Sequence, residues 1–240
     1  MKTRLDRLLV ERGLAESREK AQALIMAGEV AINGQKASKP GQPVAADCSV
    51  EVLAPPRYVS RGGFKLAAAL EHFAIDVGGK TCVDIGSSTG GFTDVLLQSG
   101  AARVHAVDVG AGQLAWRLRT DPRVAIHEGI NARQLRPEDI GERVDFLTCD
   151  VSFISVTLIL PAAAALLQPA GQMVILIKPQ FEVGKGQVGK GGIVRDPQLH
   201  QTACDRVTGA VRDLGFATSI MPSPILGAEG NKEFLLYAHH

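Results

Sequence analysis

Aromatic residues, net charge and long apolar runs are all scarce in this sequence. Phe, Trp and Tyr make up 5% of the 240 residues while Gly contributes 26, which suits helices packed on a sheet better than an aromatic-rich β sandwich. No stretch approaches the roughly 18 uncharged apolar residues of a membrane span. No apolar signal core follows the charged start Met1–Arg7. We therefore expect a cytoplasmic protein without a membrane partner.

Cysteine is sparse as well. The four cysteines form no CxxC pair and have no metal-type spacing, so we expect no metal site. Cys82, Cys149 and Cys204 lie in or beside apolar runs or expected helices, which is typical of buried free thiols in a reducing compartment. A hydrophobic share of 45% against 21% charged residues is sufficient for a packed core and excludes wholesale disorder.

The first 56 residues differ in pattern from the rest of the chain. Leu5–Leu9 has leucines at helical spacing, and Ser17 is a suitable N-cap for a second helix. Val30–Gln35 predicts a strand that enters an Asn-Gly hairpin turn, and Ser49–Leu53 predicts a further strand. The sequence therefore predicts a small domain of two helices and a β hairpin.

This small domain is mildly basic. Through Arg61 it has ten basic and seven acidic residues, a net charge of +3 that fits a solvated surface as well as a nucleic-acid interface. Its pattern resembles the S4 RNA-binding domain in the segments Arg4–Leu9, Ser17–Ala21, Ile25–Val30 and Ile32–Gly34. The resemblance implies contact with structured RNA. The candidate RNA-binding residues in this part are Arg4, Arg7, Arg18, Lys20, Lys36 and Arg61.

From Lys80 the chain alternates apolar strands with helices. The expected strands are Thr81–Ile85, Val104–Asp108, Val144–Asp150 and Met173–Lys178. This alternation indicates a parallel sheet covered on both faces, and Phe216–Ile220 with Phe234–Tyr237 adds a terminal antiparallel hairpin. The predicted fold class is α/β, a Rossmann-like sheet preceded by a small α+β domain. We place the small domain at 1–56, a linker at 57–63 and the large domain at 64–240.

A glycine-rich loop follows the first strand and opens a helix. It reads Asp84-Ile85-Gly86-Ser87-Ser88-Thr89-Gly90-Gly91-Phe92, in which glycines allow a tight turn and close approach to a ligand. The sequence contains neither the G-x-G-x-x-G of a dinucleotide site nor the G-K-[ST] of a phosphate loop at this place. Asp84 suits a ligand with an ammonium group and no phosphate.

The next strand carries a second cofactor signal. Asp108 ends it at the distance where nucleotide-binding sheets place a carboxylate for the ribose hydroxyls. An adenosine-containing, cationic cofactor without phosphate is S-adenosylmethionine. Each feature alone is common without a ligand, but together they favour the cofactor; Asn131 either borders the adenine or is a turn residue. The candidate cofactor residues are Asp84, Gly86, Ser87, Ser88, Thr89, Gly90, Gly91, Phe92, Asp108, Asn131 and Asp150.

Two ionisable residues end strands at the edge where such sheets place their sites. Lys178 follows five apolar residues, and desolvation would lower its pKa toward the roughly 7–8 at which a lysine acts as a base. Asp150 beside it would oppose that shift. Lys65 lies early in a helix before the cofactor strand, and Glu233 lies in the last strand. Taken singly, each of these fits a solvated surface residue.

Their order changes that interpretation. Lys65, Asp150, Lys178 and Glu233 resemble the Lys-Asp-Lys-Glu tetrad of the FtsJ-like ribose 2′-O-methyltransferases. A ribose hydroxyl is a poor nucleophile until a base removes its proton. The resemblance implies that Lys178 is that base, that Asp150 and Glu233 orient it, and that Lys65 places the hydroxyl or a phosphate.

Longer motifs narrow the resemblance to the TlyA family. They are Tyr58–Leu66, Asp84–Asp94, Cys149–Ser155, Lys178–Glu182 and Val188–Asp196. Members join an S4 domain to an FtsJ-like methyltransferase and are described as rRNA cytidine-2′-O-methyltransferases, and historically as haemolysins. The resemblance implies a 16S and/or 23S rRNA substrate in ribosomal subunits or ribosomes.

Three further hypotheses remain. The glycine-rich stretch Phe181–Asp196 carries Lys185, Lys190 and Arg195, and is either a basic loop that closes over RNA or a solvated loop. A membrane-active haemolysin would need an apolar segment, and the candidate, Val156–Leu167, is short and broken by a proline. A non-catalytic RNA-binding assembly factor would not bind S-adenosylmethionine.

Overall fold

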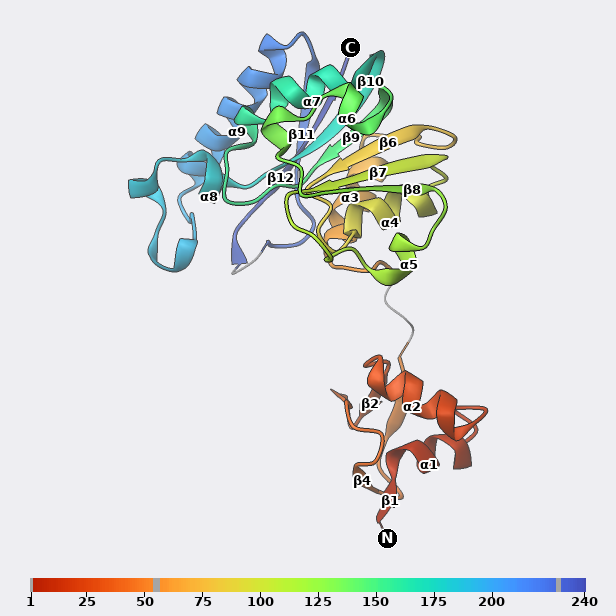
Figure 1. Cartoon of the computed structure of the whole chain (residues 1–240). Helices are drawn as coiled ribbons and strands as arrows, with labels where there is room; N and C mark the ends of the chain where they lie inside the picture. The colour runs from red at the N-terminus through yellow and green to blue at the C-terminus, as the bar shows by residue number, and fades with distance from the viewer. Residues whose placement is uncertain (1, 54–56, 228–229) are drawn as a thin grey trace. The chain divides into compact units, whose positions relative to one another are not determined.

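The computed structural model describes residues 2–53, 57–227 and 230–240, and of Lys185 the backbone alone. The chain divides into two compact units, Met1–Arg57 and Tyr58–His240, and each has its own core (Figure 1).

The N-terminal unit consists of two helices and two small sheets. Its elements are β1 (Lys2–Arg4), α1 (Leu5–Glu11), α2 (Arg18–Met26), β2 (Val30–Ile32), β3 (Gln35–Lys36), β4 (Pro43–Ala45) and β5 (Val50–Val52). Ser17 caps α2 by accepting the Lys20 N–H at 3.2 Å, as its sequence predicts. Asn33 and Gly34 have φ of 49° and 80°, the two positive values of the hairpin turn expected between β2 and β3. The β1–β4 pair was not expected.

The predicted linker at 57–63 differs from the structure, because the segment from Tyr58 belongs to the second unit. The Tyr58 side chain is buried and packs edge-on against Phe64. The Val59 N–H donates to Asp94 Oδ2 at 2.8 Å. A side chain at Gly63 would overlap Tyr58. These contacts fix the start of the second unit ahead of its first helix.

The second unit is built around a seven-stranded sheet of order β11-β12-β10-β9-β6-β7-β8. The strands are β6 (Thr81–Ile85), β7 (Arg103–Asp108), β8 (Val124–Glu128), β9 (Val144–Cys149), β10 (Leu167–Ile177), β11 (Ala217–Pro222) and β12 (Phe234–His239). The five strands from β10 to β8 are parallel, and β12 pairs antiparallel with both β10 and β11. The α/β sheet with a terminal antiparallel hairpin is therefore confirmed.

Helices cover both faces of this sheet (Figure 1). One face packs against α3 (Gly62–His72), α4 (Gly91–Gln98) and α5 (Trp116–Arg119). The elements outside that face are η1 (Ala132–Gln134), α6 (Pro137–Ile140), η2 (Val156–Leu158), α7 (Leu160–Leu166), α8 (Pro179–Glu182), η3 (Lys185–Gln187), η4 (Lys190–Gly192) and α9 (Pro197–Asp213). The short apolar segment Val156–Leu167 forms η2 and α7, with its proline in the first turn of α7.

The sheet has one topological switch point. From β6 the chain proceeds to β7 on one side, and β9 lies on the other side of β6. In open α/β sheets, ligands bind beyond the carboxyl ends of the strands at such a point. The glycine-rich loop after β6 lies there.

Candidate active site

The loop between β6 and α4 turns back on itself through hydrogen bonds to β7. The Gly86 N–H donates to the Val107 carbonyl at 2.8 Å, and the Ser88 N–H donates to Asp108 Oδ2 at 2.8 Å. Gly86 has φ of +81°, and a side chain there would overlap the Asp150 backbone. Glycine is therefore required at this position, as its place in the loop predicts.

Asp84 lies at the end of β6 and lines a cavity beside the glycine loop, so its role toward a ligand stays a prediction. Its side chain is fully buried, and it accepts hydrogen bonds from the Thr93 N–H at 2.9 Å, the Thr93 hydroxyl at 2.7 Å and the Thr148 hydroxyl at 2.9 Å. Burial raises the pKa of Asp84 to about 6, although these hydrogen bonds oppose the rise. In the structure the Asp84 carboxylate fastens α4 and β9 to the end of β6.

Asp108 stands at the carboxyl end of β7, as predicted. Oδ2 accepts from Ser88, and Oδ1 accepts the Gly110 N–H at 2.7 Å. Gln113, which the sequence did not single out, accepts a hydrogen bond from the Ser88 hydroxyl at 3.2 Å. The side chains of Ser88, Asp108 and Gln113 all line one cavity.

Two cavities meet at this loop. The larger, of about 460 Å³, is lined by Gly86, Ser88, Val107, Asp108, Val109, Gln113, Ile130, Asn131, Ala132, Asp150, Val151, Ser152, Phe153, Ile154 and Ile159. The smaller, of about 200 Å³, is lined by Ser60, Gly62, Lys65, Asp84, Gly86, Ser87, Ser88, Thr89, Gly91, Phe92 and Asp150. They share Gly86, Ser88 and Asp150, so both open at the end of β6. Of the predicted cofactor residues, Gly90 lies in the loop but lines neither cavity.

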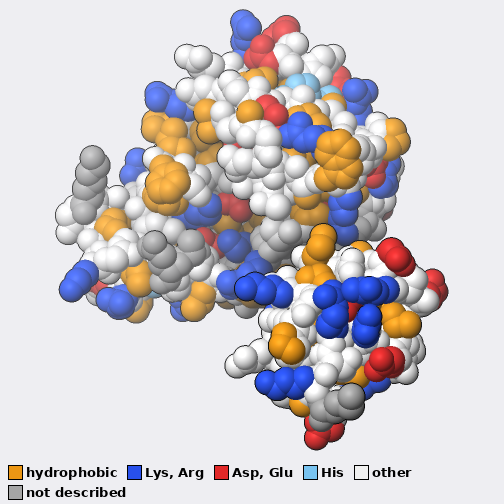
Figure 2. All heavy atoms as spheres, turned by 60° about the horizontal axis from the view of Figure 1, so that its bottom comes forward, with side chains coloured by type: hydrophobic (Ala, Val, Ile, Leu, Met, Phe, Trp, Pro, Cys, Tyr) orange, Lys and Arg blue, Asp and Glu red, His pale blue; other side chains and the backbone are white. Residues whose placement is uncertain are grey.

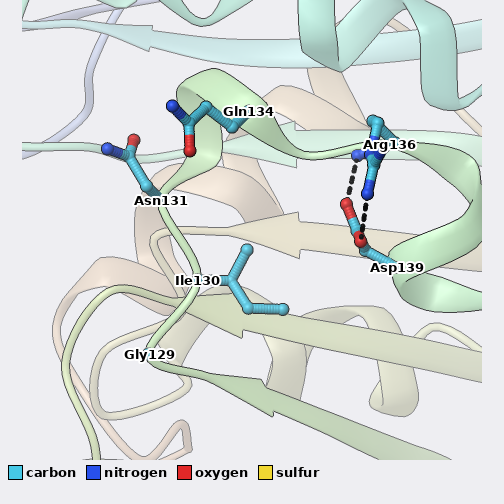
Figure 3. Close-up of a pocket in the computed structure, with 6 residues that line it drawn as sticks. All are labelled: Gly129, Ile130, Asn131, Gln134, Arg136 and Asp139. Atoms are coloured by element: carbon cyan, nitrogen blue, oxygen red, sulfur yellow. Dashed lines mark hydrogen bonds and ion pairs between the residues drawn. The ribbon is translucent and has the colours of Figure 1, made fainter.

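Asn131 is a turn residue that also lines the 460 Å³ cavity, and its place beside an adenine stays a prediction. Its Oδ1 accepts the Arg133 N–H at 3.1 Å as a turn residue, and its side chain lines the 460 Å³ cavity. It also borders a polar cavity of about 510 Å³ on its other side. Figure 3 shows this second cavity, with Asn131 and Gln134 at one side and the Arg136–Asp139 pair at the other.

Lys178 and Asp150 meet at the ends of adjacent strands. Lys178 Nζ lies 2.5 Å from Asp150 Oδ1 and donates a hydrogen bond to the Ser152 hydroxyl at 2.8 Å. The Lys178 side chain is 11% exposed. The Asp150 Oδ1 atom is buried, and despite the ion pair it has no aligned hydrogen-bond donor among the residues that the structure describes. A buried acceptor without a donor is unusual and points to a bound group.

A buried glutamate holds the segment after β9. Glu182 accepts hydrogen bonds from the Ser155 hydroxyl at 2.6 Å and from the Val156 N–H at 2.8 Å. Within this segment Phe153 is 92% exposed with φ of +66°, and its ring centroid lies 5.4 Å from that of Phe181. Left-handed backbone is costly for a bulky residue. Neither Glu182 nor Phe153 was assigned a role from sequence, although both lie within the motifs.

Lys65 and Glu233 form a second buried pair. Lys65 Nζ donates to Glu233 Oε2 at 2.5 Å, and the two side chains are 9% and 2% exposed. The structure thus pairs Glu233 with Lys65, whereas the resemblance implied that it orients Lys178. A side chain at Gly227 would overlap the Glu233 carboxylate, so glycine is needed there.

Lys65 also lies between the 200 Å³ cavity and a further cavity. A cavity of about 450 Å³ is lined by Arg61, Gly62, Lys65, Ile225, Leu226, Gly227 and Gly230. It shares Gly62 and Lys65 with the 200 Å³ cavity. Lys65 therefore lines both cavities.

The predicted RNA-binding residues fall into three groups. Arg4, Arg7, Arg18, Lys20 and Lys36 are exposed on the N-terminal unit, where Figure 2 shows Lys and Arg side chains grouped on the face toward the viewer. Arg61 is exposed at the start of α3 and lines the 450 Å³ cavity. Lys190 and Arg195 are exposed between α8 and α9, and the side chain of Lys185 lies outside the described residues.

The sheet, the glycine loop and the two lysine–carboxylate pairs are typical of a Rossmann-like methyltransferase, here joined to an RNA-binding module. Residues 58–240 match the family model of the FtsJ-like methyltransferases, and residues 3–47 match that of the S4 domain. The 16S/23S rRNA (cytidine-2′-O)-methyltransferase TlyA of Mycobacterium tuberculosis is 50% identical over 239 residues, which cover 98% of this chain and 89% of the relative.

Two further relatives support the same family assignment. Hemolysin A of Brachyspira hyodysenteriae is 43% identical over 98% of both chains. A solved structure from Streptococcus thermophilus is 46% identical, with a TM-score of 0.76 over 99% of this chain and 88% of that one. The chain belongs to the TlyA family of FtsJ-like methyltransferases that carry an S4 domain.

The described residues also bear on the alternatives. None of their helices has the length and apolarity to cross a membrane. They hold no cluster of three His, Cys, Asp or Glu side chains arranged for a metal ion.

Proposed function

We propose that this protein is an S-adenosylmethionine-dependent methyltransferase that acts on the 2′-hydroxyl of a cytidine in ribosomal RNA, within a subunit or the ribosome. The observation that carries the proposal is the placement of both lysine–carboxylate pairs around the cavities of the glycine loop. Lys65 and Asp150 line the same 200 Å³ cavity, and Lys178 lies against Asp150. Family membership supports the same reaction.

The residues present fit S-adenosylmethionine. The 460 Å³ cavity offers the Asp108 carboxylate for ribose hydroxyls and the apolar side chains of Ile130 and Ile159 for a base. Asp150, at the junction of the two cavities, places a carboxylate where a cationic group can bind. When bound, the cofactor supplies an electrophilic methyl carbon on a sulfonium.

The chain supplies the proton acceptor and the positioning. Lys178, in its neutral amine form, accepts the proton of the ribose hydroxyl, and Asp150 and Ser152 fix its orientation. Lys65, held by Glu233, stands between the cofactor-side cavity and the 450 Å³ cavity, where it contacts the hydroxyl or a neighbouring phosphate. Proximity and orientation of the two reactants then account for much of the rate.

The test compares wild-type protein with Lys178→Ala. We expect the variant to bind S-adenosylmethionine normally by calorimetry and to lose methylation of ribosomal subunits isolated from cells without the gene. Mass-spectrometric mapping of ribose methylation then identifies the nucleotide. Lys80→Ala is the matched control, because Lys80 lies at the amino end of β6 and the site lies at the carboxyl end. Full activity of Lys178→Ala would remove this lysine from the mechanism.

The alternatives give different results in the same preparation. A non-catalytic assembly factor would bind rRNA but not S-adenosylmethionine at millimolar concentration. A membrane-active haemolysin would release dye from liposomes as purified, detergent-free protein.

A further inference from the structure

A carboxylate is buried among the basic residues of the N-terminal unit. Asp6, on α1, is fully buried. Its Oδ1 accepts from Arg4 Nε and the Arg7 N–H, both at 3.0 Å, and its Oδ2 accepts from Arg4 Nη2 at 2.8 Å. Oδ2 also accepts from Arg18 Nε at 3.0 Å and Gln22 Nε2 at 2.9 Å. A buried charge is tolerated when it is paired and hydrogen-bonded in this way.

The hydrogen bonds keep this group ionised. Donation from Arg4, followed by that from Gln22 and Arg18, holds the pKa of Asp6 well below its usual range despite burial. The carboxylate is therefore ionised at neutral pH.

Arg4 and Arg18 each use only part of the guanidinium group to bind Asp6. Arg4 uses its Nε and Nη2 and Arg18 uses its Nε, while their side chains remain 44% and 46% exposed. A guanidinium has five N–H donors, so the outward donors of both groups remain for a ligand. Phosphate oxygens match such donors in geometry and charge.

A glycine lies against the Arg4 guanidinium. A β-carbon at Gly41 would lie 3.1 Å from Arg4 Nη1 and 3.2 Å from Nη2. The adjoining backbone is tied to α1, since the Leu5 N–H donates to the Gln42 carbonyl and the Asp6 N–H donates to the Pro40 carbonyl, both at 3.1 Å. Arg4 is thus held between a carboxylate and a loop.

We propose that Asp6 is a positioning residue for RNA binding, which holds Arg4 and Arg18 as a preformed pair for phosphate groups of the RNA backbone without touching the RNA. Arg7 and Lys20, exposed on the same two helices, extend this cationic surface. The inference rests on the proposed function in that the ligand is RNA. An arginine that is already ordered loses less conformational entropy when a phosphate binds.

Charge alone predicts the opposite outcome. Removal of a negative charge beside a nucleic-acid site normally strengthens binding, because phosphate attraction increases. If Asp6 is a positioning residue, Asp6→Asn weakens binding although the net charge rises by one. The sign of the change therefore separates the two roles.

The experiment measures the dissociation constant of the full chain for ribosomal subunits across a salt series. We expect Asp6→Asn and Gly41→Ala each to weaken binding about tenfold, with a higher KM for RNA rather than a lower kcat. Gly41→Ala changes no charge and crowds Arg4 at an exposed loop position. The control is Glu11→Gln, an equal charge change at the exposed end of α1, which should bind as tightly as wild type or more tightly.

The outcomes separate this inference from the reaction itself. A folded Asp6→Asn variant that binds as well as Glu11→Gln overturns the positioning role. If Asp6→Asn does not fold by circular dichroism, Gly41→Ala decides, and its equality with wild type overturns the proposal. RNA binding is measured without turnover. If the protein does not methylate RNA but its RNA binding depends on Asp6, the proposed reaction is wrong and the positioning role of Asp6 stands.

Discussion

The Glu182 carboxylate accepts a hydrogen bond from the Ser155 hydroxyl at 2.6 Å and thereby ties α8, whose N-cap is Lys178, to the segment after β9. Lys178 and Ser152, which also contact each other, lie on these two segments. The proposed base, Lys178, and the serine that contacts it are therefore held by a neighbouring hydrogen bond. This arrangement gives Glu182 a positioning role that can be tested.

Glu182→Ala should lower the affinity for S-adenosylmethionine. It removes the acceptor of the buried Val156 N–H, at a cost of about 1–3 kcal/mol in unfolding free energy, while the half-buried Ser155 hydroxyl keeps its contact with Thr157. It also releases the segment from Ser152 to Ile154 that lines the 460 Å³ cavity. Calorimetry and thermal melting measure both effects. Glu182→Gln, which keeps an acceptor, should recover most of the loss; equal behaviour of the two variants would contradict the role.

Lys178→Arg should be folded and inactive. The guanidinium keeps a donor for Ser152 beside Asp150, but it does not give up its proton at ordinary pH and so is no proton acceptor. We expect a loss of about 100- to 10,000-fold in kcat with unchanged cofactor affinity. Single-turnover methylation of ribosomal subunits provides the measurement. Activity close to wild type would show that no proton passes through residue 178.

Removal of either partner of the Lys65–Glu233 pair should destabilise the second unit. Lys65→Met or Glu233→Met leaves one buried charge uncompensated, at a cost of about 3–5 kcal/mol in unfolding free energy. The double variant should recover much of this stability but not the activity. Denaturant titration of all four proteins yields the coupling energy. Arg136→Met, which breaks the exposed pair with Asp139, is the control and should cost less than about 1 kcal/mol.

Asp84 should make stability fall as the pH rises through 6. Its folded pKa of about 6 lies above the ordinary 3.8, so the folded state binds the proton more tightly than the unfolded state does. The stabilisation is complete below about pH 4 and is lost above pH 6, a difference of about 2 kcal/mol between pH 4 and pH 7. Asp84→Asn should lack this component. Parallel urea titrations at the two pH values test it, and identical pH dependence of both proteins would contradict it.

The local pattern of the sequence was sufficient for most elements. Ser17 and the Asn33-Gly34 turn act within a few residues of chain, where capping and turn chemistry decide the conformation. The parallel strands follow from their apolar runs. The pair β1 and β4 was missed because β1 reads Lys-Thr-Arg, with no apolar residue, and β4 begins with a proline, which is unusual in a strand.

The sequence predicted which residues belong to the candidate site better than it predicted which of them contact each other. The order of Lys65, Asp150, Lys178 and Glu233 brought all four to attention, but their actual pairing depends on how α3 and β12 pack. The hydrogen bonds of the buried Asp84 to Thr93 and Thr148 were also not foreseen. Contacts of this kind join residues far apart in sequence, and periodicity carries no signal for them.

The pair Lys65–Glu233 joins positions 168 residues apart. A contact of such long range forms only when nearly the whole second unit has folded, because intermediate fragments lack one partner. Catalytic competence is then a cooperative, all-or-none property of that unit. Thermal inactivation should follow its global melting curve rather than precede it.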